Sequence, residues 1–293
     1  MKIIQLLFIL TSFCSSQKFP RSTKETFLNS VGIYYRKIYT GVPLLIFTKS
    51  SLAATNTDDF LYKRSISYES NQYQPGISSK DVYYPLWFEG KWKTSSNFTS
   101  FKYPLDVNFG GSSYNKTSSE LYSSLEYISK FKVDQNFNDK CISDRLYNVE
   151  QISIASLGKN CILSDEQNSN DISNYLNILL RPDKATNTIF NISLRVTDRE
   201  FYEGANKRFN VFERIEQSIQ IQSEFQSRTS IKDIETTTSY RMISDNLIRA
   251  TQRTATFLSP KDPRFKQYYA INPDISQTSV DIRKYDVLFT KIN

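Results

Sequence analysis

From Trp87 onward, apolar residues alternate with polar residues along much of the chain. A period of two is typical of strands that bury one face, because successive side chains of a strand point to opposite sides of its sheet. The pattern therefore predicts a body built from many short strands. The alternating positions are Ile152 and Ile154; Leu176, Ile178 and Leu180; Phe190, Ile192, Leu194 and Val196; Ile215, Gln217, Ile219 and Ile221; and Ile234, Thr236, Thr238, Tyr240 and Met242.

Helical periodicity is weak by comparison. The best candidate for a short helix is Ser118–Lys130, which carries Leu121, Leu125 and Ile128 at helical spacing. Many strands separated by polar turns favour a closed antiparallel barrel or a sandwich, because closure removes exposed sheet edges. We therefore expect residues 82–293 to form one all-β domain, an antiparallel barrel with short helical segments, and the 20 Phe, 19 Tyr and 2 Trp of the chain supply ample core material.

Residues 1–16 have the features of a secretory signal peptide. Lys2 precedes the apolar run Ile3–Phe13, and Cys14-Ser15-Ser16 supplies small residues for cleavage. The run is shorter than the roughly 20 apolar residues that cross a bilayer, so we expect no transmembrane span in the mature chain. The alternative is a buried N-terminal strand.

Residues 17–54 are predicted to form a transit and thylakoid-transfer leader. The segment up to Lys49 is basic and nearly free of acids, and a second apolar run, Val42–Phe47, leads to small residues at Ser51–Ala54. The order signal, transit, signal resembles the leaders of thylakoid-lumen proteins in algae whose plastids are reached through the secretory route. We expect a lumenal protein with a disordered leader and a polar linker over residues 55–81. The alternative is a secreted protein with a disordered pro-segment.

The net charge of the chain comes almost entirely from this leader. Residues 1–57 hold seven basic residues against one acid, Glu25. Subtracting these from the totals of 37 and 30 leaves 30 basic and 29 acidic residues in the body. A body that is close to neutral lacks the clustered Lys and Arg that bind a phosphate backbone, so no nucleic-acid partner is expected.

The chain contains no histidine, and this absence excludes several kinds of chemistry. Ser-His-Asp and Cys-His nucleophilic sites, imidazole zinc sites and His-ligated haem all need that residue. The eight glycines never fall in the spacing of a dinucleotide or phosphate loop, and no Asp-rich calcium loop is present. We therefore expect no metal and no cofactor.

The most informative local motif runs from Tyr83 to Trp92, Tyr-Tyr-Pro-Leu-Trp-Phe-Glu-Gly-Lys-Trp. Four further motifs follow it in order: Asp144-Arg145-x-Tyr147-Asn148, Glu235-Thr236-Thr237-Thr238-x-Tyr240, Gln252-Arg253-Thr254-Ala255 and Leu258-Ser259-Pro260-Lys261-Asp262-Pro263. Together they resemble an uncharacterised lipocalin-like (calycin-type) family of cyanobacteria and plastids, a domain of unknown function. The resemblance spans roughly Val82–Leu288, and Ser112–Lys140 departs from it. It carries over no catalytic residues.

This resemblance implies a structural role for Gly90, Trp92 and Arg253. In lipocalin-like barrels Gly-x-Trp opens the first strand, the indole plugs the closed end, and an Arg from the last part of the barrel often lies across it. Arg249 and Arg253 share a strand face with Phe257, so either one is a candidate for that arginine. The alternative is a surface arginine.

Cys141 and Cys161 are the cysteines that remain after leader removal. A disulfide between them would stabilise the fold by about 3 kcal/mol on the loop-entropy model. The alternatives are two free buried thiols or a redox pair, although their separation is unlike the C-x-x-C motif. Asn97, Asn115 and Asn191 begin acceptor sequences for N-glycosylation.

The expected function is therefore non-enzymatic. A barrel of about eight strands has room for one small ligand, so we expect a small apolar ligand such as a pigment, quinone or lipid, or a role in photosynthetic assembly with a protein complex as partner. Two alternatives stay open: a partner-binding scaffold with a filled barrel, and an enzyme acting on a pigment, similar to bilin lyases or de-epoxidases. Asp233 and Glu235 share a strand face that we expect to be solvated, so catalysis there is not expected.

Overall fold

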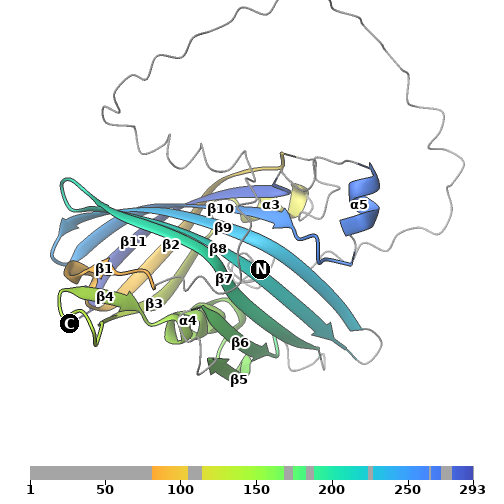
Figure 1. Ribbon diagram of the computed structural model, residues 1–293, viewed down its shortest axis with the longest axis horizontal. Coiled ribbons are helices and arrows are strands. Elements are labelled where there is room, and N and C mark those ends of the chain that lie inside the picture. Colours follow the sequence, from red (N-terminus) through yellow and green to blue (C-terminus); the bar gives the residue numbers. More distant parts are fainter. Residues whose placement is uncertain are drawn as a thin grey trace, which may run out of the picture.

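The computed structural model describes residues 81–104, 114–167, 174–182, 188–223, 227–263, 265–271 and 279–292. The expected signal, transit and linker segments lie almost entirely outside these residues. The described part forms one sheet whose eleven strands pair in the order β1-β4-β3-β2-β11-β10-β9-β8-β7-β6-β5 (Figure 1). The strands are β1 (Tyr84–Pro85), β2 (Gly90–Lys102), β3 (Ser124–Val133), β4 (Lys140–Ser143), β5 (Ile162–Gln167), β6 (Tyr175–Leu180), β7 (Ile189–Gly204), β8 (Arg208–Gln222), β9 (Ser227–Ser244), β10 (Leu247–Leu258) and β11 (Asp281–Ile292).

The expected all-β, antiparallel architecture is confirmed. Every neighbouring pair of strands in the sheet is antiparallel. Along β2, the buried residues are Trp92, Thr94, Ser96 and Phe98, which alternate with more exposed positions. The pleat thus separates an inner face, which carries Trp92, from an outer face.

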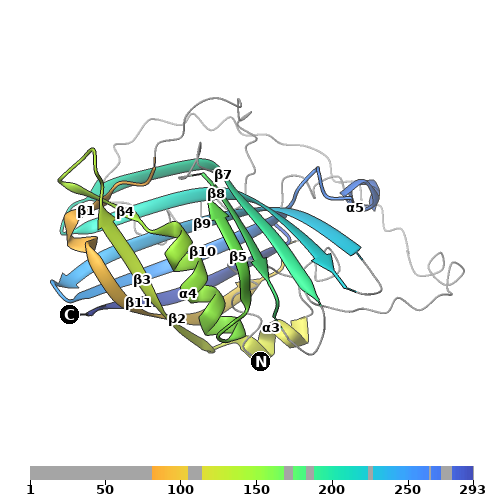
Figure 2. The same ribbon diagram turned by 90° about the horizontal axis from the view of Figure 1, so that it is seen from below.

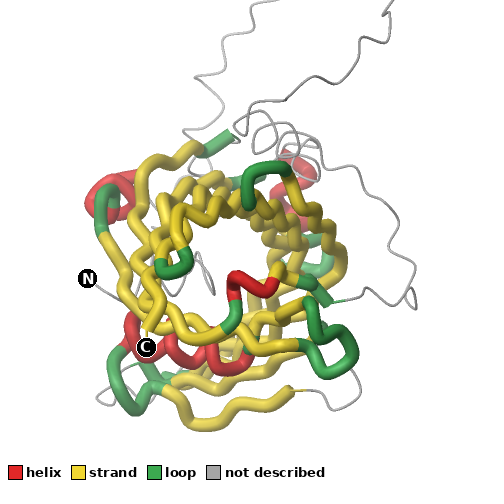
Figure 3. Tube along the Cα trace, turned by 90° about the vertical axis from the view of Figure 1, so that its left-hand side faces the viewer, coloured by secondary structure: helices red, strands yellow, loops and turns green. Residues whose placement is uncertain are grey.

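The sheet curls into a ring-like section but does not close (Figure 3). Its edge strands, β1 and β5, do not pair with one another, so the expected closed barrel is not formed by backbone hydrogen bonds among the described residues. Helix α4 (Arg145–Leu157) packs against both β3 and β5 and lies across the opening (Figure 2). A helix therefore takes the place that a closing strand would need.

Side chains complete the ring at this opening, which we call the seam. Asn148 on α4 accepts a hydrogen bond from the Lys130 backbone N–H at 2.7 Å and donates one to its carbonyl at 3.2 Å. Farther along, Lys140 of β4 pairs with Glu203 of β7 at 2.6 Å. The Asn148 amide thus satisfies backbone groups of Lys130, and the ion pair links the side chains of β4 and β7.

Two local predictions from the sequence are wrong. Ile152 and Ile154 were expected in a strand but lie in α4, which ends where Gly158 adopts φ +96°. The expected helix over Ser118–Lys130 overlaps α3 (Tyr114–Glu120) only at residues 118–120, and residues 124–130 belong to strand β3, which begins at Ser124. Two further short helices, η1 (Leu86–Phe88) and α5 (Phe265–Ile271), complete the described elements.

Two apolar clusters fill the inside of the curled sheet. The larger surrounds Trp92 and includes Phe88, Phe131, Phe209 and Tyr240, and the ring of Phe88 meets those of Phe209 and Tyr240 edge to face. The second lies under α4. Its buried members are Leu125, Ile152, Cys161, Ile178, Leu180, Ile192 and Ile219.

Candidate functional site

A pocket of about 200 Å³ lies inside the curled sheet beside α4. Its apolar wall comes from Val149 on α4, Leu176 on β6, Leu194 and Val196 on β7 and Ile215 on β8. These strand residues face inward because they fall on the buried phase of the alternation. The polar residues of the wall are Ser143, Arg145, Asn148, Asn174, Tyr175, Glu213, Thr236 and Gln252.

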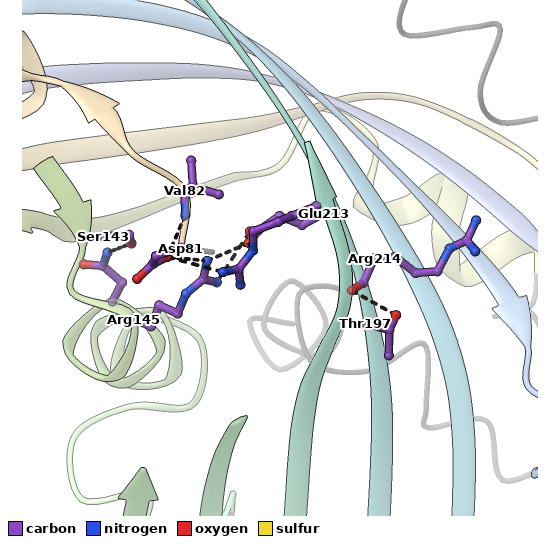
Figure 4. Close-up of polar contacts among 9 residues, drawn as sticks. Asp81, Val82, Ser143, Arg145, Thr197, Glu213 and Arg214 are labelled. Atoms are coloured by element: carbon purple, nitrogen blue, oxygen red, sulfur yellow. Dashed lines mark hydrogen bonds and ion pairs between the residues drawn. The ribbon is translucent and has the colours of Figure 1, made fainter. Parts of the chain in front are cut away.

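Four charged side chains meet at the seam beside this pocket, and three of them, Asp81, Arg145 and Glu213, are labelled in Figure 4. Arg145 Nη2 donates to Glu213 Oε1 at 2.6 Å, and Nη1 lies 3.4 Å from Oε2, so the guanidinium holds the carboxylate with both of its ends. Arg199 Nη1 lies 3.6 Å from Asp81 Oδ1, and its Nε lies 3.4 Å from Glu213 Oε1. We call Asp81, Arg145, Arg199 and Glu213 the seam cluster; it contains two positive and two negative groups.

Burial and neighbouring charges oppose each other in the seam cluster. Burial by itself raises the pKa of Glu213, but Arg145 and Arg199 more than offset this and lower the pKa below its ordinary value. Burial by itself lowers the pKa of Arg145, and Glu213 and Asp81 more than offset that effect. Glu213 is therefore held as a carboxylate and Arg145 as a cation at neutral pH.

Two polar side chains on the opposite wall of the pocket are unengaged. Thr236 on β9 and Gln252 on β10 form no side-chain hydrogen bond with another residue of the described part of the chain. They lie on adjacent strands, since Gln252 is opposite Thr238 and Thr254 is opposite Thr236. A hydroxyl and a primary amide are thus available to a ligand that enters the pocket.

Trp92 and Gly90 lie at the end of the ring that carries β1 and η1. Trp92 is fully buried, and its Nε1 donates to the carbonyl of Phe88 at 2.7 Å. Gly90 begins β2 with φ +109°, a backbone conformation that glycine adopts without strain. Gly-x-Trp was expected to open the first strand; here it opens β2, which follows the two-residue strand β1.

Arg253 does not lie over Trp92, so that prediction is corrected. The side chains of β10 that join the cluster around Trp92 are Ile248 and Ala250, whereas Arg253 has the other parity and points to the outer face. The cation over the indole is Lys291, whose Nζ lies 5.5 Å from the ring centroid. Arg253 is buried on the outer face, and this burial lowers its pKa to about 10.

The disulfide that the sequence allows is not formed, and both cysteines are free and buried. Cys141 belongs to the cluster around Trp92, while Cys161 belongs to the cluster under α4. Burial raises the pKa of the Cys141 thiol to about 11 and also raises that of Cys161. Of the three interpretations of this pair, two buried free thiols is the one that the structure contains.

The three glycosylation acceptors lie on different elements. Asn97 is exposed on β2 and Asn191 is half-buried on β7, with its Oδ1 unpaired among the described residues. Asn115 falls within α3, and its side chain lies outside the described part.

The expected solvated face at Asp233 and Glu235 is buried instead. Glu235 forms an ion pair with Arg214. The side chain of Arg214 lies on the outer face of β8, whereas that of Glu213 lies on the inner face (Figure 4).

Sequence reasoning missed the seam cluster. Arg145 and Asn148 belong to a quoted motif, Asp144-Arg145-x-Tyr147-Asn148, but their roles depend on partners more than 15 positions away in the chain. No spacing rule connects Arg145 with Glu213. A charged residue that replaces an apolar one in the inward phase of a strand, as Glu213 does before Ile215, is the local signal that was available.

Within the described ranges, no group of three or more side chains is arranged to hold a metal ion. Within those same ranges, the helices all fall short of the length and apolar character needed to cross a membrane. A comparison with the curated proteins gives no match. Residues 76–292, well over half of the chain, match a family described as a domain of unknown function, DUF6816. The chain therefore belongs to the DUF6816 family.

Proposed function

We propose that this chain is a non-enzymatic, lipocalin-like binding protein that holds one small apolar ligand inside its curled sheet. The observation that carries the proposal is the interior pocket, whose wall combines five apolar side chains with eight polar or charged residues. That combination is typical of small-molecule sites, in which apolar contacts supply affinity and polar groups fix orientation.

The size of the pocket limits the ligand. A cavity of about 150 Å³ holds one benzene ring, and drug-sized ligands occupy about 300–1,000 Å³. A pocket of about 200 Å³ therefore suits one substituted ring, or the ring of a longer molecule whose tail lies elsewhere. A quinone head fits this limit, whereas a whole carotenoid or bilin exceeds it.

The polar groups define what the ring should carry. Gln252 offers an amide N–H, and Thr236 offers a hydroxyl that donates or accepts. Arg145 is occupied by Glu213, so the pocket offers no free cation from that residue to a carboxylate ligand. A carbonyl or hydroxyl substituent is the expected partner for this wall.

The proposal is tested with full-length protein and two ring-sized carbonyl probes, duroquinone and β-ionone, by titration calorimetry. We expect one-to-one binding that is lost in Ile215→Trp, because the indole fills the pocket. Ile243→Trp places the same side chain at an exposed position of β9 and serves as the control. Gln252→Leu should weaken binding about tenfold, the effect of one lost hydrogen bond.

Two results would overturn the binding function. The first is no uptake of either probe, which would favour the alternative of a scaffold that binds a protein partner. The second is uptake that is equal in Ile215→Trp and in the wild type, which would locate the ligand elsewhere.

The enzyme alternative receives little support from Glu213. An acid–base catalyst without histidine would need a carboxyl group whose pKa is raised toward neutrality. Glu213 lines the pocket, but its two arginine partners lower its pKa.

We further propose that the protein works in the thylakoid lumen, on the basis of the tripartite leader. The test compares fluorescent fusions of the full chain with and without residues 35–54. Different destinations would support the assignment, and a shared destination would refute it.

A further inference from the structure

A second hollow lies on the outer face of the sheet, apart from the interior pocket. It is a groove of about 520 Å³ that crosses β8, β9, β10, β11 and β2. Most of its lining residues occupy the outward phase of their strands and point away from Trp92, whereas Tyr240, Ala250 and Val287 belong to the inner cluster. The outward polar and charged residues of the groove include Arg208, Arg241, Arg249, Thr251, Asp286 and Asn97.

Three arginines form a row at one end of this groove. Arg241 on β9 is directly opposite Arg249 on β10 and also directly opposite Arg208 on β8. Opposite side chains of an antiparallel pair have Cβ atoms about 4.5–5.5 Å apart, so the row extends over about 10 Å. All three side chains are exposed.

The arginine row is not neutralised by the described part of the protein. None of the three guanidinium groups forms an ion pair or a hydrogen bond with another described residue. Asp286 of the same groove lies opposite Thr251, which is two residues along β10 from Arg249. Asp286 does not form an ion pair with Arg249. Like charges directly opposite one another on a sheet are unfavourable, and a bound anion relieves that repulsion.

Arginine is the side chain that best matches an oxyanion. Its planar fork of N–H donors binds phosphate and similar groups through two parallel hydrogen bonds. Three such forks around one hollow provide more donors than a single carboxylate accepts. They suit a group with three terminal oxygens.

The other end of the groove has a different chemistry. Asn97, Thr251 and Asp286 lie across β2, β10 and β11, where Asp286 is opposite both Asn97 and Thr251. An amide, a hydroxyl and a carboxylate side by side are hydrogen-bonding partners for hydroxyl groups. The carboxylate also disfavours a second anionic group at this end.

We propose that the outer groove binds a soluble, hydroxyl-bearing phosphate or sulfate monoester, such as a sugar phosphate. The anionic group lies on the row of Arg208, Arg241 and Arg249, and the hydroxyl groups lie against Asp286 and Asn97. This site is independent of the interior pocket, because the two lie on opposite faces of the sheet.

The experiment uses full-length protein at low ionic strength and isothermal titration with glucose 6-phosphate, inorganic phosphate and neutral glucose. We expect glucose 6-phosphate to bind at least tenfold more tightly than either of the others. Arg241→Gln should reduce its affinity by more than tenfold. Arg228→Gln removes the same charge from an exposed position of the same strand and should change affinity less than twofold.

Three results would overturn the proposal. Equal losses in Arg241→Gln and Arg228→Gln would mean general attraction by net charge. Inorganic phosphate that binds as tightly as glucose 6-phosphate would remove the hydroxyl subsite. Binding only to vesicles that contain phosphatidylglycerol, with none to the soluble ester, would make the groove a membrane contact instead.

Folding of the variants is checked separately from binding. Far-ultraviolet circular dichroism and thermal unfolding should be unchanged or slightly improved in Arg241→Gln, because the substitution removes like-charge repulsion. If Arg241→Gln is instead less stable, Arg249→Gln tests the same row at one of its ends, with the same expected loss of affinity.

Discussion

Replacing Glu213 with glutamine removes one of the two negative charges of the seam cluster while it keeps the shape of the side chain. Of the carboxylates in the seam cluster, Asp81 would then remain as the counter-charge that Arg145 and Arg199 share. The four side chains are 3% to 19% exposed, so water compensates only part of the imbalance. Breaking a buried ion pair in this way costs about 3–5 kcal/mol. For a domain of this size, that cost corresponds to a decrease in Tm of roughly 6–20 °C.

The pH dependence of stability has a definite sign. The folded-state pKa of Glu213 lies below its ordinary value of 4.5. The stabilisation from this carboxylate is therefore complete above about pH 4.5 and is lost as the pH falls through the folded-state pKa. In Glu213→Gln this part of the acid destabilisation should be absent, so the difference from the wild type should shrink as the pH falls below 4.5.

The assay is urea unfolding at several pH values, followed by tryptophan fluorescence. Glu126→Gln is the control, because Glu126 pairs with Lys93 on the exposed surface, where losing the pair should cost less than about 1 kcal/mol. The double variant Arg145→Met with Glu213→Leu restores charge balance and should be more stable than Glu213→Gln. A Glu213→Gln chain within about 1 kcal/mol of the wild type at pH 7 would refute the idea that the cluster holds the seam.

Three further predictions concern single residues. Gly90→Ala forces a Cβ onto a left-handed backbone and should lower the free energy of unfolding by about 1–3 kcal/mol. Gly204 has an ordinary φ, so Gly204→Ala should have a small effect, and equal effects of the two substitutions would contradict this reasoning. Trp92→Phe leaves the buried carbonyl of Phe88 without its donor and should cost at least about 1–3 kcal/mol in urea unfolding; an unchanged midpoint would argue against that hydrogen bond. Because burial raises the pKa of Cys141 to about 11, iodoacetamide at pH 8 should label this thiol roughly a hundredfold more slowly in folded than in unfolded protein. Mass spectrometry of the peptide that contains Cys141 gives the two rates, and equal rates would show an accessible thiolate.

The alternation of apolar residues was sufficient to predict the strands and their antiparallel class. It succeeded where a strand buries one face, as β6 does with Leu176, Ile178 and Leu180. The alternation failed at Ile152 and Ile154, which are two positions apart and therefore fit a strand pattern. Val149 and Ile152, three positions apart, lie on one face of helix α4. Short apolar runs do not distinguish the two cases.

The candidate site was less accessible to sequence reasoning. The alternation along β10 places Arg253 and Ile248 on opposite faces of the strand. It does not show which face is the inner one. The sequence therefore wrongly predicts Arg253 on the face that carries Trp92. The arginine row illustrates a second limit. Arg208, Arg241 and Arg249 are far apart in the chain and meet only through the register of three strands. Register depends on turn geometry and on long-range pairing, which a single sequence does not encode locally.

The girth of a hydrogen-bonded barrel is set by its strand number and stagger. In this chain α4, Asn148 and the Lys140–Glu203 pair span the remaining gap instead of a backbone ladder. The width of the curled sheet therefore depends on the lengths of the side chains that bridge this gap. Substitutions of a few residues at the seam would then enlarge or reduce the interior pocket in other members of the family while every strand pairing stays in place.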